Sequence, residues 1–213
     1  MNEALGLVLV GVLLVNFLML GTSRLNAAIH FAGLQGVLLG TALFVAHGQT
    51  SARVLLLALA TVALKGAAIP TILLRALRNV SIRREIEPIV GFTPSLVLGA
   101  LATGLSLLFA RSLPLQGEQL SPLIVPASFA TVLTGFLVLT TRRKAITQVV
   151  GYLTLENGVF VFGLLLVEAI PFLVEIGVLL DLLVAVFVLG IIMNHIQREF
   201  SSLSTEHLTS LRE

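Results

Sequence analysis

The chain has 213 residues, of which 57% are hydrophobic and only 11% carry a charge. Soluble domains are about 45–50% apolar and about 25% charged, so a water-soluble fold could not cover its surface with so few polar side chains. The mean hydropathy of +1.05 and a net charge of only +2 therefore indicate a chain dissolved in lipid and give no reason to expect nucleic-acid binding.

Seven stretches are long and apolar enough to span a bilayer, which takes roughly 20 residues. They cover residues 3–22, 26–46, 53–77, 93–112, 122–141, 145–167 and 171–196. Short polar or proline-containing segments separate them. The sequence thus predicts an all-α integral membrane protein of about seven transmembrane helices.

The basic residues gather on one side of this arrangement. Ten lie on the side of the loops after the first, third and fifth spans and of the C-terminal tail: Arg24, Arg75, Arg78, Arg83, Arg84, Arg142, Arg143, Lys144, Arg198 and Arg212. The opposite side holds only Arg53 and Arg111. Because cytoplasmic loops are enriched in Lys and Arg, this bias predicts a cytoplasmic C-terminus and an N-terminus outside.

A weak internal repeat is also visible. The segment SRLNAAIHFAGLQGVLLG resembles TRRKAITQVVGYLTLENG, with Arg24 matching Arg142 and Gly33 matching Gly151 at an offset of 118 residues. We expect two parallel three-helix repeats with the fourth helix as a spacer. The predicted units are residues 1–80 (first repeat), 81–120 (cytoplasmic loop and spacer helix) and 121–213 (second repeat and short cytoplasmic tail).

Lys65 lies in the middle of the third span, too far from either end for its side chain to reach the headgroups. A charge at that depth costs about 2.5–3.5 kcal/mol on insertion scales and usually faces a bundle interior or a water path. Pro70 lacks the N–H that would bond the carbonyl of Gly66, which leaves backbone acceptors near the lysine. A proton-relay or gating role and a structural salt bridge are both consistent with this pattern.

Glu156 lies in mid-helix in VVGYLTLENGVFVFG. A carboxylate at that depth suits a group that loads and releases protons; the alternative is a hydrogen-bonded structural acid. Asp181 and Glu175 share the seventh span, about 9 Å apart along its axis. Asp181 is the deeper of the two, whereas Glu175 lies close enough to Pro171 to stabilise a helix N-terminus instead.

Other polar residues give weaker signals. Asn16, Gln35 and Gln148 are candidates for interhelical hydrogen bonds. His30 and His195 are secondary proton-path candidates near the predicted cytoplasmic side, with a structural role as the alternative, and Gln35 is a third secondary candidate.

The run Arg142-Arg143-Lys144 predicts a topology anchor, with a docking patch for a cytoplasmic subunit as the alternative. Without cysteines the chain cannot form disulfides or hold an iron–sulfur centre through thiolates. Its histidines lack ligand spacing, so neither a metal nor a cofactor is expected, and the sequence shows no nucleophile–base arrangement.

The first three spans resemble the small K-type subunit of respiratory complex I and its Mrp-antiporter counterpart. Those subunits carry a basic turn before GLE, with the Glu in the middle of the second helix and another buried acid in the third. Here RLNAAIHFAGLQG reproduces the spacing with Gln35 at the acid, and Lys65 stands where the second acid would be. The last three spans resemble the same subunit again, with Glu156 three residues beyond the aligned position and Asp181 near the position matching Lys65.

A duplicated K-like subunit with an extra helix, carrying GYLTLENGVFVFGL in its second half, resembles the hydrogenase-4 component E family. The resemblance implies a non-catalytic subunit of a membrane-bound nickel–iron hydrogenase complex in the prokaryotic cytoplasmic membrane. Its implied partners are antiporter-like membrane subunits, a quinone- or hydrogenase-module anchor, and cytoplasmic nickel–iron hydrogenase-like and iron–sulfur subunits. The leading hypothesis is proton translocation through the buried charges; a purely architectural subunit and an independent ion or solute transporter are the alternatives.

Overall fold

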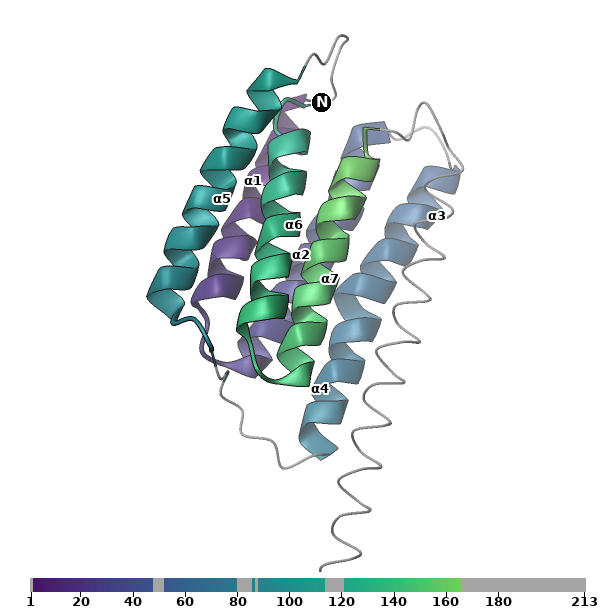
Figure 1. Cartoon of the computed structure of the whole chain (residues 1–213). Helices are drawn as coiled ribbons and strands as arrows, with labels where there is room; N and C mark the ends of the chain where they lie inside the picture. Colours follow the sequence, from purple (N-terminus) through teal and green to yellow (C-terminus); the bar gives the residue numbers. More distant parts are fainter. Residues whose placement is uncertain (1, 48–51, 80–85, 87, 114–120, 166–213) are drawn as a thin grey trace, which may run out of the picture.

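The computed structural model describes residues 2–47, 52–79, 86, 88–113 and 121–165. Every regular element in this part of the chain is helical (Figure 1). The elements are α1 (Asn2–Gly21), α2 (Leu25–His47), α3 (Ala52–Thr61), the π-helix η1 (Val62–Ala68), α4 (Ile69–Asn79), α5 (Phe92–Ser112), α6 (Ile124–Thr141) and α7 (Ala145–Gly163).

Six predicted spans are confirmed within the described residues. The elements α3, η1 and α4 follow one another without a break and make up the third span, and each of the six is long and apolar enough to cross a membrane. The predicted seventh span, residues 171–196, lies outside the described residues. A total of seven helices therefore stays a prediction.

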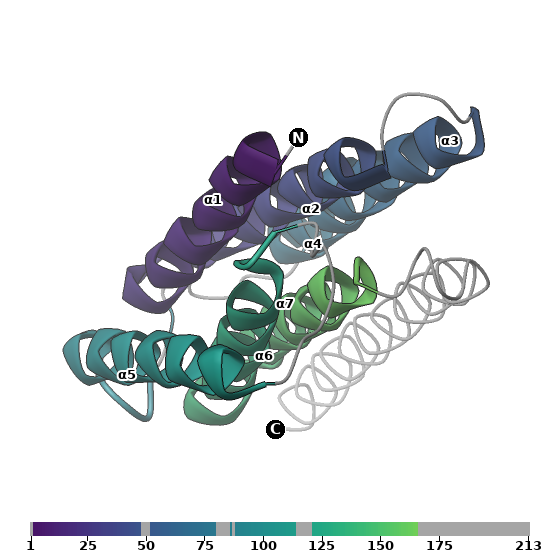
Figure 2. The same cartoon turned by 90° about the horizontal axis from the view of Figure 1, so that it is seen from above.

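The helices form two layers, seen end-on in Figure 2. One layer holds α1, α2 and the third span, and the other holds α5, α6 and α7. Across the layers α1 packs on α5 and α6, and α2 packs on α7. Successive spans run in opposite directions, so the α1–α2 and α6–α7 turns lie at the same end of the bundle (Figure 1).

Glycines bring α2 very close to the third span. A Cβ atom added to Gly36 would lie 2.6 Å from the carbonyl carbon of Lys65, and one on Gly33 would lie 2.9 Å from Cγ of Pro70. A Cβ on Gly40 would meet Val62. In lipid, small residues let helix backbones approach and gain van der Waals contact, because no hydrophobic effect drives helices together there. We call Gly33, Gly36 and Gly40 the glycine groove.

A second close approach joins α6 to α7. Gly135 on α6 faces the backbone of Leu155, and a Cβ on Gly151 would lie 2.5 Å from the backbone nitrogen of Leu139. The predicted repeat makes Gly33 and Gly151 equivalent. They face different neighbours, however, because Gly33 packs on the third span and Gly151 on α6, the first helix of its own triplet. The duplication therefore stays a prediction.

Arg142, in the α6–α7 turn, is only 1% exposed. Its guanidinium donates to the carbonyls of Val90 at 3.0 Å and Leu20 at 3.1 Å, and to the hydroxyl of Ser95 at 3.4 Å. It also lies over the ring of Phe92, 5.1 Å from the centroid. One side chain thus ties together the ends of α1 and α6 and the beginning of α5.

This placement excludes Arg142 from the docking patch that was the alternative to a topology anchor. The side chain points into the bundle end, and its desolvation lowers the pKa of the guanidinium. An arginine remains charged in a protein, so the carbonyls it contacts must compensate that charge. Only Arg143 of the basic run is exposed.

Replacing Gly36 by Ala tests the glycine groove. The new methyl group would collide with the backbone of Lys65, and we expect a loss of about 1–3 kcal/mol in stability, typical of overpacking. Thermal unfolding of the purified protein in mild detergent measures the change. Gly104→Ala in α5 is the control, because a Cβ there has no atom within 4 Å; equal effects of the two substitutions would contradict the close approach.

Arg142→Lys tests the buried guanidinium. A lysine keeps the charge but cannot satisfy several carbonyls in fixed directions as the planar guanidinium does. We expect a lower thermal midpoint and faster proteolysis at this end of the bundle. The same substitution at the exposed Arg143 should change neither quantity. An unaffected Arg142→Lys protein would show that the hydrogen bonds of the Arg142 guanidinium are dispensable.

Candidate functional site

A layer of polar side chains crosses the bundle between two apolar clusters. One cluster, which includes Leu20 and Val150, fills the end with the α1–α2 and α6–α7 turns. The other, which includes Leu5 and Leu43, fills the opposite end. We define the polar layer as the buried residues Asn16, Gln35, Lys65, Thr131, Glu156 and Asn157, none more than 6% exposed. Five spans contribute to it.

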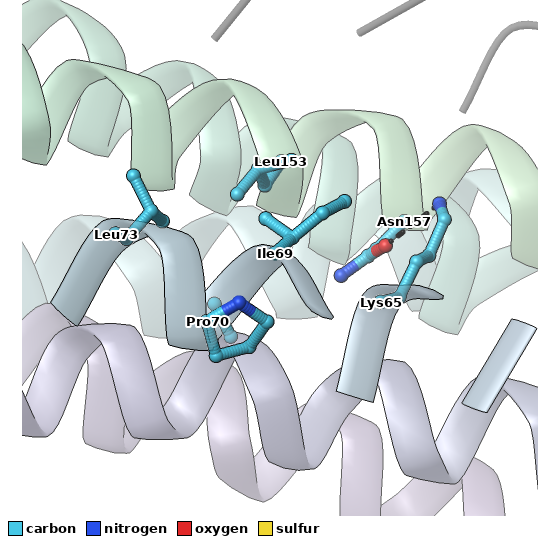
Figure 3. A pocket seen from close by; sticks show the side chains of 7 residues that line it. Lys65, Ile69, Pro70, Leu73, Leu153 and Asn157 are labelled. Carbon is cyan, nitrogen blue, oxygen red and sulfur yellow. Dashed lines mark hydrogen bonds between the residues drawn. The ribbon is translucent and has the colours of Figure 1, made fainter. Parts of the chain in front are cut away.

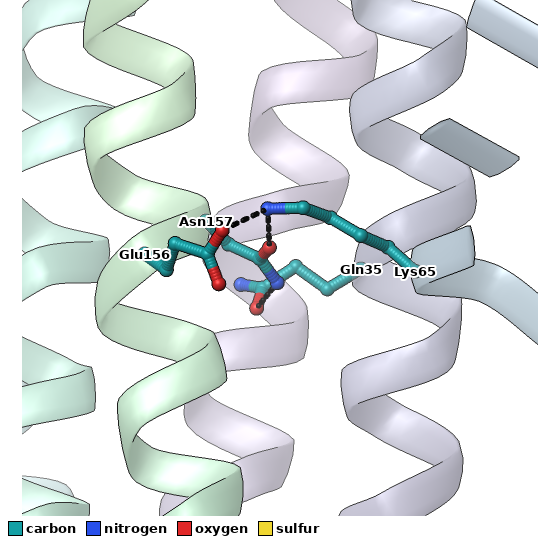
Figure 4. Close-up of polar contacts among 4 residues, drawn as sticks. All are labelled: Gln35, Lys65, Glu156 and Asn157. Carbon is teal, nitrogen blue, oxygen red and sulfur yellow. Dashed lines mark hydrogen bonds and ion pairs between the residues drawn. The ribbon is translucent and has the colours of Figure 1, made fainter. Parts of the chain in front are cut away.

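Lys65 is the charged donor at one edge of the polar layer. Its Nζ donates to Oδ1 of Asn157 at 3.0 Å and to Oε1 of Glu156 at 3.3 Å (Figure 4). The ring of Phe160 lies 5.3 Å from the same nitrogen, within cation–π range. The ammonium is therefore held by α7, across the bundle from its own helix.

From Asn157 the hydrogen bonds continue through three more helices. Its Nδ2 donates to Oε1 of Gln35 at 3.0 Å, and Nε2 of Gln35 donates to Oδ1 of Asn16 at 2.8 Å. Asn16 in turn donates to the hydroxyl of Thr131 at 2.8 Å, which donates to the carbonyl of Ala127 at 2.7 Å. We call this series the amide chain; all its donors point away from Lys65.

The π-helix η1 places Lys65 at the depth of the amide chain. The N–H of Ile69 bonds the carbonyl of Leu64, five residues earlier, instead of four as in an α-helix. Pro70, one residue further, has no N–H to continue either pattern. Short π-helical segments occur often at functional sites. Here the segment coincides with the buried lysine and with the tightest part of the glycine groove.

A small cavity adjoins this irregular segment (Figure 3). It is lined by Lys65, Pro70, Asn157 and apolar side chains, and its volume is about 10 Å³. That is about the lower limit for one water molecule. Lys65 and Asn157 supply the polar lining such a molecule needs.

The Lys65–Glu156 contact is loose for an ion pair. Charge-assisted N–H···O bonds are usually about 2.7–2.9 Å long, whereas this one is 3.3 Å. Both side chains are nevertheless buried. Removing one partner of a buried pair leaves an uncompensated charge, which is strongly unfavourable. Each of the two charges therefore needs the other to stay buried, although the distance between them is long for an ion pair.

The polar layer contains two kinds of side chain: groups that can gain or lose a proton, and groups that only orient a neighbouring charge. Carboxamides and hydroxyls neither gain nor lose a proton near neutral pH, so Asn16, Gln35 and Asn157 can orient a charge but not store one. Glu156 and Lys65 are the titratable members of the layer. Chemically, the arrangement can hold a proton at Glu156 beside an ammonium whose position is fixed by amides.

The structure brings together Lys65, Glu156 and Gln35 among the predicted site residues. His30 does not join them: it is exposed, and its Nδ1 bonds the carbonyl of Asn26 at 2.6 Å. Asp181, Glu175 and His195 lie outside the described residues. Their places in a proton path stay predictions.

Asn16 and Gln35 make the interhelical hydrogen bonds expected of them. Gln148 does not: its side chain donates to the carbonyl of Arg142 in the adjoining turn. Sequence reasoning missed Asn157 and Thr131. Asn157 could have been suspected because it follows Glu156 directly in LENG, whereas a single threonine in an apolar span carries no comparable signal.

These features define a helical membrane protein with an ion pair in the middle of its bundle. The chain belongs to the same family as the uncharacterized protein Rv0085 of Mycobacterium tuberculosis, to which it is 32% identical over 208 residues, or 95% of this chain and 93% of that protein. It is also similar to Hydrogenase-4 component E of Escherichia coli and of Shigella flexneri, at 29% identity over 145 residues, 68% of this chain and 67% of each relative.

No family model matches the chain, and no solved structure matches it. The similarity to Hydrogenase-4 component E is distant, but it agrees with the resemblance seen in the sequence and with the apolar helices. It extends over about two thirds of the chain.

A double-mutant cycle tests the coupling of Lys65 to Glu156. Lys65→Gln alone leaves a buried carboxylate without its cation, and we expect a loss of about 3–5 kcal/mol in stability. The double variant with Glu156→Gln should recover much of that loss. Unfolding in detergent gives the stability of the two single variants, Lys65→Gln and Glu156→Gln, and of the double variant. Arg111→Gln, at an exposed helix end, is the control for charge removal. Additive effects would mean that the two side chains do not interact.

Proposed function

We propose that this protein is a membrane subunit of a hydrogenase-type redox complex, related to complex I, in the prokaryotic cytoplasmic membrane. Its part in that complex is proton translocation or coupling, with Glu156 as the proton carrier. The observation that carries the proposal is the buried Lys65–Glu156 pair at the middle of six apolar spans. Charged groups at such depth generally mark ion or proton paths.

The geometry supports a simple coupling step. When Glu156 takes up a proton, its negative charge is lost and the attraction that opposes the buried ammonium disappears. Lys65 keeps its bond to Asn157, so the layer is left with a net positive charge in an apolar interior. Such a state is costly unless another charge near the layer, in this chain or in a neighbouring subunit, changes at the same time. Proton uptake here is thereby linked to charge elsewhere in the complex.

The chain's composition fits a subunit of this kind. With no cysteines it has no thiolates for an iron–sulfur centre, so any such centre would belong to partners. We propose antiporter-like membrane subunits and a quinone- or hydrogenase-module anchor as neighbours within the bilayer. Cytoplasmic nickel–iron hydrogenase-like and iron–sulfur subunits complete the set.

The end of the bundle with the α1–α2 and α6–α7 turns carries the exposed residues Arg24, Arg75 and Arg143. By the positive-inside rule these residues support a cytoplasmic location for that end and an N-terminus outside. Asp181 and Glu175 would continue the path from Glu156 in the seventh span.

A purely architectural subunit is the second candidate. The continuous amide chain and the close glycine contacts favour it, because both join helices without requiring any proton to move. This role predicts that substitutions in the polar layer disturb assembly or have no effect.

Glu156→Gln in the intact complex separates the two functions. Removing the titratable group should abolish most proton movement. Because the single variant also removes the opposite charge that faces Lys65, the double variant with Lys65→Gln is tested beside it, and there electron transfer and subunit composition should stay near those of the unmodified complex. Proteoliposomes with a pH-sensitive dye report proton movement, and native gels report assembly. Glu3→Gln, at an exposed position, is the matched control. Unchanged proton movement in an assembled Glu156→Gln complex would refute the proton-carrier role.

The partners are identified by mild-detergent purification of the tagged native protein followed by mass spectrometry. We expect antiporter-like and hydrogenase-like subunits to co-purify in fixed ratios. A protein that purifies alone or with itself would instead point to an independent transporter.

A further inference from the structure

The direction of the amide chain follows from the charge on Lys65. An ammonium has three N–H donors and no acceptor, so Asn157 must present Oδ1 to it. The amide nitrogen of Asn157 then faces Gln35, which must present its own oxygen. The same constraint passes to Asn16 and fixes which end of each amide faces the next residue. No single amide in the series can turn over without bringing two donors or two acceptors together.

The far end of the chain is a group that can reverse. The hydroxyl of Thr131 accepts from Asn16 and donates to the carbonyl of Ala127. A hydroxyl rotates freely between donor directions, and the Asn16 amide lies only 2.8 Å from it. Thr131 can therefore donate to Oδ1 of Asn16 instead, if that amide turns over. The carbonyl of Ala127 would give up one side-chain bond and keep its place in the helix.

A neutral lysine removes the constraint at the other end. The uncharged amine has a lone pair and can accept a hydrogen bond from Nδ2 of Asn157. With each amide turned over, Asn157 would accept from Gln35, Gln35 from Asn16, and Asn16 from Thr131. Every bond between neighbours is kept with its donor and acceptor exchanged, because the oxygen and nitrogen of a carboxamide have nearly the same size. The chain thus has two hydrogen-bonded orientations, of which only one accommodates the ammonium.

We propose that Asn157, Gln35 and Asn16 are positioning residues for Lys65 and, with Thr131, form a two-orientation chain that carries the protonation state of Lys65 to α6. The chain crosses from the third span through α7, α2 and α1, so its end lies in the other layer of the bundle. Protons do not travel along it, because carboxamides do not exchange them readily. What moves is the orientation of the amide dipoles.

One group beside Lys65 can take up its proton. Among the described residues, the charged group that faces it is Glu156 on α7, while α2 presents glycines and Gln35 from the other side. A proton passing from Nζ to the Glu156 carboxylate breaks one N–H bond and forms one O–H bond. It leaves both groups neutral, so the charge balance of the layer is unaltered and the transfer itself does not depend on pH. Loss of the Nζ proton to solvent as the pH rises neutralises Lys65 in the same way, and this loss is what a titration follows. This inference goes beyond the proposed function, in which Glu156 carries the proton and Lys65 stays charged, because it requires that Lys65 change its protonation state.

Nitrogen NMR of the full-length protein in lipid bilayers tests the chain. The protein has only two lysines, Lys65 and Lys144, so Lys144→Arg leaves a single Nζ signal in ¹⁵N-lysine-labelled protein. The side-chain amide signals of Asn157 and Asn16 are followed in the same samples over a pH titration, each assigned by a serine substitution. We expect the Asn16 signal to change over the same pH range as Nζ, although three hydrogen bonds separate the two groups.

Two sets of variants distinguish orientation from general structural change. In the Gln35→Met protein the Asn157 amide signal should still change together with the Nζ signal, whereas the Asn16 signal should no longer change. Thr131→Val, which lacks the reversible hydroxyl, should abolish the Asn16 response, and Thr131→Ser should restore it. A merely structural role would not give this pattern of loss and rescue.

Two outcomes would overturn the inference. One is an Asn16 signal that stays constant while Nζ titrates, and the other is an Nζ signal that stays that of an ammonium at every pH where the protein is folded. Neither outcome decides the proton-carrier role of Glu156, because the proton-movement assay on Glu156→Gln measures that separately. Failure of the amide chain and failure of the proposed function are therefore distinguishable.

Discussion

The structure depends on the burial of one ammonium group in the middle of an apolar bundle. Lys65 cannot reach water from its depth, so its charge must be satisfied by other helices. Glu156 supplies the opposite charge, and Asn157 supplies a fixed acceptor. The requirement then extends outward, because each amide that turns its oxygen toward one neighbour must find an acceptor for its nitrogen. The other members of the polar layer are thus required, directly or through a neighbour, by that single charge.

Backbone geometry and side-chain chemistry meet at the same residue. The π-helix η1 surrounds Lys65, and Gly36 lets α2 lie directly against the lysine backbone. A larger residue in the glycine groove would move the helix that positions the ammonium. The irregular turn and the close packing thus belong to one arrangement, in which the depth and direction of Lys65 are set by α2 while its partners are set by α7.

The sequence was sufficient to predict the spans, because about 20 consecutive apolar residues have few alternatives to crossing a membrane. It also identified Lys65 and Glu156, since charges in such segments are conspicuous. It could not show that they meet, because nearly every face of these helices is apolar and their rotation is unspecified. Thr131 and the burial of Arg142 escaped for a related reason: a threonine or a loop arginine is ordinary until the neighbouring helix ends are known.

The two apolar clusters on either side of the polar layer have an electrical consequence. Dry protein polarises weakly, so a transmembrane voltage falls mainly across such apolar barriers and little across a polar stratum between them. A charge brought to the layer from either surface would cross about half of the field, worth about 1.1 kcal/mol per 100 mV. The occupancy of a site at this depth would respond to membrane voltage as well as to the proton concentration on either side.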